Sequence, residues 1–213
     1  YVSSNGTDWK GPVQIADKGY WLWQTTWQAG VGYARGYRWG HRDATKLYYT
    51  KDGSEYTQLV NHLRPPGDRS NEHAMFFDDE GRAHMLLRRD NATSKQAGLA
   101  LLGQSEAPYT DWEWRRLNVS IGGPSIIELP DGRIIACVRR YAAENHRDWG
   151  SQWTEIGWIN PATATYTPST KLPSGGDSSY AGLVWYNGLL WISYYSSHNG
   201  KTSIYLAKVS IPD

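Results

Sequence analysis

The sequence predicts an all-β fold made of repeated four-stranded antiparallel sheets, and three observations lead to this prediction. Apolar residues alternate with polar ones in short runs, a pattern typical of strands and not of helices. Gly, Asn, Asp and Pro bound these runs, and the 213 residues include 22 Gly and 10 Pro. Turn glycines recur about every 50 residues, with two hairpins in each unit. Radial repetition of such units gives a β-propeller, and we expect about four blades in this chain.

Four units follow one another along the chain, and each begins with the strand that we expect to lie innermost in its blade. Residues 1–16 precede them and are expected to form the last two strands of another blade, while the final unit ends after three strands. We therefore expect residues 1–213 to be a single propeller domain that is incomplete on its N-terminal side. The alternatives are closure of the last blade by the leading strands, or a partner chain that carries the other blades. The units begin near Tyr20, Asn71, Gly122 and Ser178.

Composition excludes several classes of function. The net charge of +1 gives no long-range field that would gather nucleic acid. No apolar run reaches the roughly 18 residues of a membrane span. The first residues lack the basic and apolar regions of a signal peptide. The sequence therefore leaves the compartment unknown, and secreted and periplasmic locations are the candidates. No motif indicates a metal or a cofactor, and the single cysteine, Cys137, lies in an apolar run where we expect an inert, buried thiol.

Two segments share a turn pattern that we expect in outer hairpins of the blades. Ser3–Trp9 and Thr50–Tyr56 both follow Ser/Thr-x-Asp/Asn-Gly-x-x-aromatic. In this pattern the Asp or Asn side chain accepts hydrogen bonds from local backbone amides, and the Gly adopts a positive φ. Ser105–Trp112 is a degenerate third copy. The pattern resembles the Asp-box, or bacterial neuraminidase (BNR) repeat, of the sialidase superfamily. This resemblance implies six blades in the parent protein and concerns fold, not activity.

The resemblance extends to the inner strands, where a propeller gathers its active site. Asn71-Glu72, a turn ending at Gly81 and the doublet Arg88-Arg89 occur in the order of a sialidase stretch. By this match Glu72 partners a catalytic tyrosine, and Arg88 belongs to a group of arginines that bind the carboxylate of sialic acid. Neighbouring strand residues face opposite sides, so Arg89 is left as the alternative. Such a doublet also commonly guards a sheet edge against aggregation.

Two further segments complete the expected site. One blade later a strand ends in Arg139-Arg140, where Arg139 is the preferred second arginine and Arg140 and Arg147 are alternatives. The segment before Leu183 resembles the motif around the sialidase nucleophile, which implies that Tyr180 is the nucleophile. The aspartate acid/base and the third arginine of the family come from its first blade, and neither is identifiable in this sequence.

The chemistry of sialic acid explains why these residue types belong together. Its anomeric carbon carries a carboxylate that would repel an anionic nucleophile, whereas a neutral phenol activated by a neighbouring Glu avoids that repulsion. Sialidases with a tyrosine nucleophile are an exception to the two-carboxylate rule of glycosidases. Arginines bind a substrate carboxylate through charge-assisted hydrogen bonds of about 1.5–3 kcal/mol each.

The residues therefore favour an enzyme: a sialidase-like exo-glycosidase that hydrolyses a terminal sialic acid or a related acidic sugar. Its partner would be a sialoglycoconjugate or another acidic glycan, and no cofactor is implied. A propeller that binds carbohydrate or serves as a scaffold without turnover is the first alternative. A glycosidase or lyase of other specificity is the second, because one fold supports many chemistries.

Overall fold

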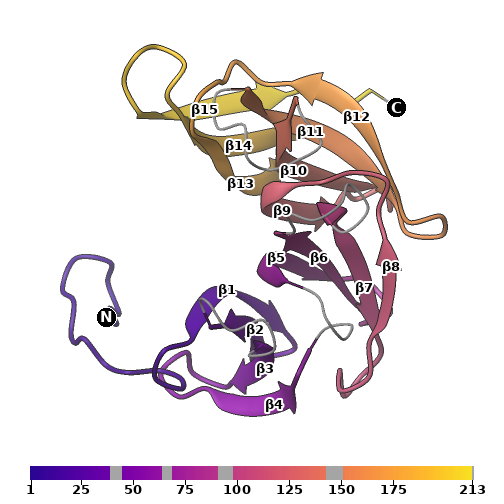
Figure 1. The fold of residues 1–213 in the computed structure, drawn as a ribbon. Coiled ribbons are helices and arrows are strands. Elements are labelled where there is room, and N and C mark those ends of the chain that lie inside the picture. The colour runs from indigo at the N-terminus through magenta and orange to yellow at the C-terminus, as the bar shows by residue number, and fades with distance from the viewer. Residues whose placement is uncertain (39–44, 64–68, 91–97, 143–150, 213) are drawn as a thin grey trace. The chain divides into compact units, whose positions relative to one another are not determined.

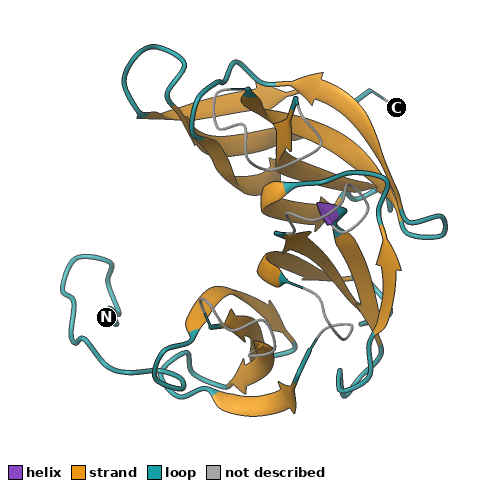
Figure 2. Ribbon diagram, in the orientation of Figure 1, coloured by secondary structure: helices purple, strands orange, loops and turns teal. Residues whose placement is uncertain are grey.

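The computed structural model describes residues 1–38, 45–63, 69–90, 98–142 and 151–212. Its strands form four antiparallel sheets, and the one helical element in these ranges is a short turn at Gly98 (Figure 2). The predicted fold class, all-β with propeller blades, is confirmed. Within the same ranges, no helix has the length and apolar character that crossing a bilayer requires.

The chain divides into two compact units, and the first comprises Tyr1–Gly67. It contains one four-stranded sheet in which consecutive strands are neighbours, joined by tight connections such as Ala29-Gly30, both at positive φ. Its largest fully buried side chains, each at most 1% exposed, are those of Arg35, Leu47, Tyr48 and Leu63. The strands are β1 (Trp21–Gln28), β2 (Val31–Tyr37), β3 (Thr45–Thr50) and β4 (Thr57–Asn61).

The second unit, Asp68–Asp213, contains three sheets. The innermost strands are neighbours, because β9 lies against β5 on one side and β13 on the other (Figure 1). The last sheet has three strands, as expected. The first sheet consists of β5 (Ser70–Phe77), β6 (Ala83–Arg89), β7 (Leu101–Ser105) and β8 (Glu113–Arg116). The second consists of β9 (Gly122–Glu128), β10 (Ile134–Tyr141), β11 (Gln152–Asn160) and β12 (Thr165–Lys171), and the third of β13 (Ser178–Tyr186), β14 (Leu189–Ser196) and β15 (Ser203–Val209).

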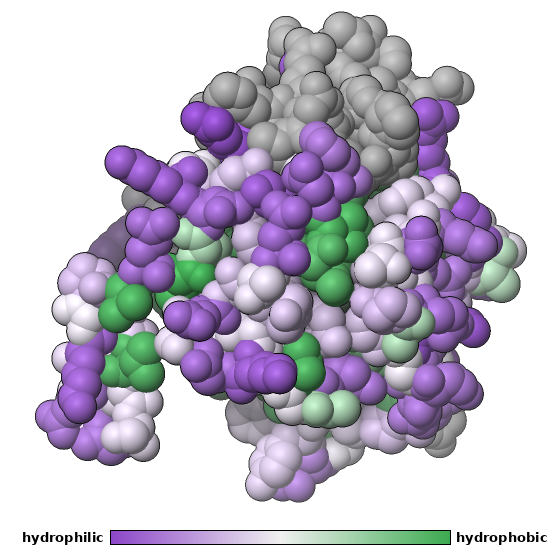
Figure 3. All heavy atoms as spheres, turned by 90° about the horizontal axis from the view of Figure 1, so that it is seen from below, coloured by the Kyte–Doolittle hydropathy of each residue, from purple (hydrophilic) through white to green (hydrophobic). Residues whose placement is uncertain are grey.

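Two hydrophobic layers hold these three sheets together, and strand β10 contributes to both. Ile134, Ala136 and Val138 pack into the layer shared with the first sheet, while Ile135 and Cys137 pack into the layer shared with the last. Both faces of β10 are therefore buried, which explains its continuous apolar run. Each fully buried Ile or Val contributes roughly 1.5–3 kcal/mol. Polar residues dominate the face of the molecule seen in Figure 3, with separate hydrophobic patches between them.

The two segments with the shared turn pattern adopt the same hydrogen bonding. In the hairpin between β3 and β4, Asp52 Oδ1 accepts hydrogen bonds from the amides of Ser54 and Glu55, at 2.8 and 3.2 Å. Asn5 Oδ1 does the same for the amides two and three residues ahead, at 3.0 and 2.9 Å. The amide oxygen of Asn5 thus accepts hydrogen bonds from the same two backbone positions as the carboxylate of Asp52.

Two other expectations differ from the structure: the pair of strands within residues 1–16, and the turn in the third copy of the pattern, Ser105–Trp112. Residues 1–16 form one isolated bridge between Val2 and Lys10, and the prediction of two strands there is wrong. An isolated two-stranded hairpin is marginally stable because it has no face to bury. The third copy does form the hairpin between β7 and β8, but Ser105 Oγ donates to the carbonyl of Asp111 at 2.5 Å in place of an Asx turn.

A β-bulge interrupts the pairing of the first strand with its neighbour in each of the four sheets of the described chain. In β5 the bulge lies between Ser70 and His73, and in β13 between Ser179 and Gly182. A bulge leaves an extra residue unpaired and re-aims its side chain. Each innermost strand therefore presents one or two side chains that do not follow the alternation of the sheet.

Candidate functional site

Glu72 lies inside the bulge of β5 and is 5% exposed. Its Oε1 accepts hydrogen bonds from Tyr180 Oη at 2.6 Å and from Arg88 Nη1 at 2.7 Å. Its Oε2 accepts the backbone amide of Gly123 in β9 at 2.8 Å. Burying an ionised carboxylate without partners is costly, and here three donors from three sheets satisfy it. Glu72 thus joins the three innermost strands of the second unit.

Tyr180 lies inside the bulge of β13, with φ at 48°, and the preceding Ser179 has φ at 102°. Non-glycine residues rarely adopt these left-handed values, and such strain is concentrated at functional sites. The residue is 40% exposed, although its hydroxyl is bonded to the buried Glu72. Burial raises the pKa of the Tyr180 hydroxyl well above its usual value and the negative charge of Glu72 raises it further, while Arg139 and Arg88 oppose the shift. The phenol is therefore protonated at neutral pH and donates to Glu72.

Of the first arginine doublet, Arg88 faces the site and Arg89 does not. Arg88 is 8% exposed and binds Glu72 and Asp90, with Nε donating to Asp90 Oδ1 at 2.9 Å. Arg89 Nη1 instead donates to the carbonyl of Leu99 at 3.1 Å. Neighbouring strand residues face opposite sides, so only one member of a doublet can reach the site.

The second doublet divides in the same way. Arg139 is 1% exposed; its Nε donates to the carbonyl of Ser178 at 2.7 Å, and its guanidinium lies 5.1 Å from the centre of the Tyr180 ring. Arg140 points into its own blade, where Nη1 donates to the carbonyl of Ser120 at 2.9 Å. The third alternative, Arg147, lies outside the described residues.

Two residues to which the sequence assigned no role also belong to this cluster. Tyr195 in β14 stacks on Tyr180, with ring centres 5.8 Å apart, and donates to Asp177 Oδ1 at 2.6 Å. Arg139 Nη2 binds both of them, at 2.8 Å to Tyr195 and 2.9 Å to Asp177. Asp177 lies within the segment Gly176–Leu183 that resembles the motif around the nucleophile, and that position was the one signal available. Tyr195 gives no signal in a sequence with 15 Tyr.

The cluster brings together a phenol, a proton acceptor and two cations. The phenol can pass its proton to Glu72 as its oxygen attacks an electrophilic carbon. Among the described residues, Arg88 Nη2 and Arg139 Nη1 have no hydrogen-bond partner, so each guanidinium keeps donors for an anionic ligand. In the same part of the chain, no group of three or more His, Cys, Asp or Glu could hold a metal ion.

No protein-family model matches the sequence, and no curated protein matches it. Solved structures do match in fold. A protein of unknown function from Dyadobacter fermentans DSM 18053 has a TM-score of 0.76 at 14% identity, covering 99% of this chain and 63% of its own.

Several of the matching structures are glycosidases, among them a xylosidase and an arabinanase. Xylan β-1,4-xylosidase from Bacillus halodurans C-125 has a TM-score of 0.65 at 12% identity, covering 93% of this chain and 42% of its own. An α-L-arabinanase from Cellvibrio cellulosa, complexed with arabinohexaose, has a TM-score of 0.59 at 13% identity, covering 91% of this chain and 74% of its own. The chain thus shares its fold with glycoside hydrolases and spans less than two thirds of the first two structures.

Proposed function

We propose that this chain carries the nucleophile and the carboxylate-binding arginines of a sialidase-like exo-glycosidase, which hydrolyses a terminal sialic acid or a related acidic sugar. The observation that carries the proposal is the 2.6 Å hydrogen bond from Tyr180 to Glu72. These residues lie 108 positions apart, so no local turn accounts for the contact. The glycosidase neighbours in fold support the reaction class and not the acidic sugar.

Hydrolysis would proceed in two steps. Tyr180 Oη attacks the anomeric carbon while its proton moves to Glu72, the glycosidic bond breaks, and the leaving oxygen takes up a proton from solvent. Water then attacks the same carbon and loses a proton to solvent, the bond to Tyr180 breaks, and the phenol regains its proton from Glu72. Two displacements at one carbon retain the configuration. Arg88 and Arg139 would hold the substrate carboxylate next to the phenol.

The test compares the variants Tyr180→Phe and Tyr195→Phe in hydrolysis of 4-methylumbelliferyl sialoside. The first removes the nucleophile, and we expect kcat to fall by a factor of about 100 or more. The second removes the hydroxyl of a stacked neighbour that does not contact Glu72, and we expect less than about a tenfold loss. Full activity of Tyr180→Phe would exclude the proposed mechanism. Circular dichroism of both variants controls for folding.

A second candidate is a glycosidase of neutral sugars, which the xylosidase and arabinanase neighbours favour. The corresponding 4-methylumbelliferyl xyloside and arabinofuranoside distinguish the two. A sialidase-like enzyme would hydrolyse only the sialoside, and the variant Arg139→Lys, which keeps the charge but not the planar fork, would raise its KM. Hydrolysis of the neutral glycosides alone would favour the second candidate.

A further inference from the structure

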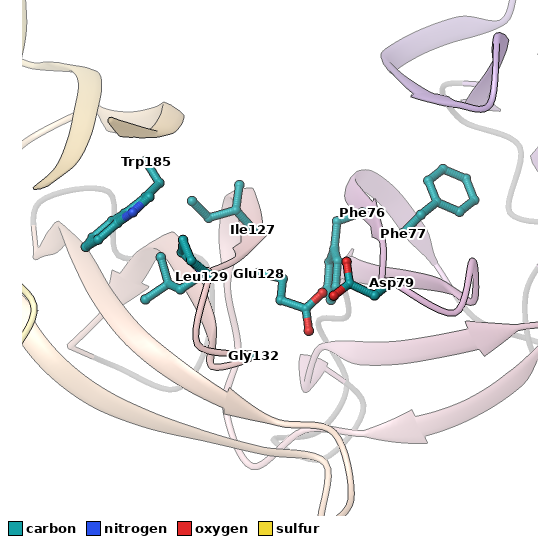
Figure 4. Close-up of a pocket in the computed structure, with 9 residues that line it drawn as sticks. Phe76, Phe77, Asp79, Ile127, Glu128, Leu129, Gly132 and Trp185 are labelled. Atoms are coloured by element: carbon teal, nitrogen blue, oxygen red, sulfur yellow. The ribbon is translucent and has the colours of Figure 1, made fainter. Parts of the chain in front are cut away.

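A pocket of about 440 Å³ opens at the opposite ends of the strands that bear the site (Figure 4). Glu72 and Tyr180 lie near the starts of β5 and β13, whereas the pocket lies near the ends of β5, β9 and β13. At about 3.3 Å per strand residue, the two ends are about 15 Å apart. The pocket therefore belongs to neither the catalytic pair nor the arginines. Its walls are Phe76, Phe77, Asp79, Ile127, Glu128, Leu129, Pro130, Gly132 and Trp185.

Most of the wall is apolar and aromatic. Phe76 is buried and stacks on His84, with ring centres 4.7 Å apart, which holds the Phe76 ring in place. On the other side, the Trp185 side chain from β13 lies beside Leu129, with its indole directed away from the two carboxylates of the pocket in this view (Figure 4). Aromatic walls of this kind attract both apolar groups and cations.

Two carboxylates complete the pocket, and Figure 4 shows those of Asp79 and Glu128 pointing toward the same space. Neither has a hydrogen bond or an ion pair with any described residue. The neighbouring Asp78 differs, because it accepts His84 Nε2 at 2.7 Å and the amide of Arg82 at 2.8 Å.

The arginines nearest in sequence already bind other carboxylates. Arg82 Nε donates to Glu106 at 2.6 Å, and Arg133 Nε donates to Asp131 at 2.7 Å. Burial raises the pKa of Glu128. The negative charges of Asp79, Asp78 and Glu80 raise it further, and His84 opposes the shift. Among the described residues His84 offsets part of the charge of Glu128, but it is already bonded to Asp78, and neither pocket carboxylate has an ion-pair partner of its own.

We propose that this pocket binds a cation carried on a short apolar stem, such as the ammonium group of an alkylamine or of a lysine side chain. The two carboxylates would accept hydrogen bonds from the ammonium group, and the aromatic walls would cover the stem. An anion is excluded by the charge, and a neutral sugar would leave both carboxylates without a counter-charge. The volume suits a ligand with a single ring.

The experiment uses ¹⁹F NMR of the full chain with 4-fluorobenzylammonium and, as its neutral and anionic counterparts, 4-fluorobenzyl alcohol and 4-fluorobenzoate. We expect the ammonium probe to bind at least about tenfold more tightly than the alcohol, and the benzoate not to bind. The variants Glu128→Gln and Asp79→Asn should each weaken ammonium binding about tenfold. Glu80→Gln is the matched control, because Glu80 is an exposed acid of the same turn that does not line the pocket.

Competition against the fluorinated probe separates the two sources of the cation. Displacement by a terminally blocked Gly-Lys-Gly peptide at lower concentration than n-butylamine would indicate a protein lysine, and the reverse order would indicate a free amine. Equal binding of the alcohol, unchanged binding in Glu128→Gln, or displacement by the Nε-acetylated peptide would overturn the proposal. Activity toward sialosides does not enter this test, so its outcome is independent of the proposed function.

Discussion

At the scale of single residues, Glu72 shows how a buried carboxylate is satisfied by three donors. Arg88 and the Gly123 amide hold it from two sides, and the hydroxyl of Tyr180 completes its set of donors. The raised pKa of Tyr180 keeps the phenol neutral, which is the state that the proposed mechanism requires. A neutral phenol suits a substrate whose own carboxylate lies on the reacting carbon, because the two groups do not repel each other before the attack.

Cys137 carries a prediction at the same scale. The thiol is fully buried between the second and third sheets, and burial raises its pKa to about 12. The thiolate is the reactive form, so the native chain should react with Ellman's reagent only when it opens. We expect the native rate to be at least about a thousandfold slower than the rate in urea, given ordinary domain stability. Equal rates would contradict the packing of β10.

At the scale of elements, the bulge in β9 determines where Tyr180 lies. Gly123 has φ at 49°, and a Cβ added there would come within 3.0 Å of Tyr180 Cδ1 and of the Tyr180 amide nitrogen. We expect Gly123→Ala to displace Tyr180 from Glu72, to lower sialoside hydrolysis about tenfold or more, and to cost more stability than the roughly 1 kcal/mol of the backbone term alone.

Gly132→Ala is the matched control for this prediction. Gly132 also has a positive φ, 79°, but a Cβ there would meet nothing within 4 Å. Both variants carry the backbone cost, and only Gly123→Ala adds the contact with Tyr180. Thermal unfolding and hydrolysis of both variants separate the two effects. Equal losses in the two would show that the bulge does not position Tyr180.

The two turns built on Asn5 and Asp52 give a prediction about how stability depends on pH. Asp52 accepts hydrogen bonds from the amide and the side chain of Ser54 and, with a smaller effect, from the amide of Glu55. These hydrogen bonds lower the pKa of Asp52 to about 2, below the value of about 3.9 in an unfolded chain. Because the folded-state pKa is the lower one, the ionised carboxylate stabilises the turn fully above about pH 4, and this contribution is lost as the pH falls toward 2. Asp52→Asn removes the titration and keeps the acceptor, as Asn5 does in the first turn. The Tm of the wild type should exceed that of the variant at pH 6, and the gap should close by about pH 2; a constant gap would contradict the argument.

At the scale of the whole molecule, much of the fold could be predicted from the sequence. The innermost strands begin at Trp21, Ser70, Gly122 and Ser178, within one residue of the expected starts. The turn glycines predicted the positions of the hairpins, because glycine adopts the positive φ of these turns without a steric cost. The expected proximity of Tyr180 and Glu72 is also present, while their catalytic roles stay predictions.

Other features lay beyond the sequence for a physical reason. Every residue of β6 is buried, so the pattern of apolar residues does not show which member of Arg88-Arg89 faces the site. Asp177 and Tyr195 join the site through a contact with Arg139 that depends on the packing of two blades. Such contacts depend on distances between elements, which periodicity does not encode.

The outward face of the last sheet carries the final prediction. Val184 and Tyr186 on β13 are both 59% exposed, and Ile204 and Leu206 on β15 are 79% and 63% exposed. Contiguous exposed apolar residues on an edge strand promote association. We expect the double change Ile204→Lys and Leu206→Lys to reduce concentration-dependent self-association in light scattering.

The control for this change adds the same two charges elsewhere. Thr167 and Ser169 are exposed on β12, the outermost strand of the second sheet. If lysines at these two positions reduce association equally, net charge and not the apolar face is responsible.

The proposed catalytic pair lies in the bulges, whereas most of the residues that pack the sheets together lie elsewhere on the strands. Glu72 and Tyr180 lie in bulges and belong to neither hydrophobic layer, whereas Ala74 and Ile192, on β5 and on the partner strand of β13, belong to them. A substitution in a bulge therefore changes what one end of the blades can bind without creating a void between sheets. We therefore expect substitutions at Glu72 and Tyr180 to change the chemistry at this end of the blades more than the apolar packing between the sheets.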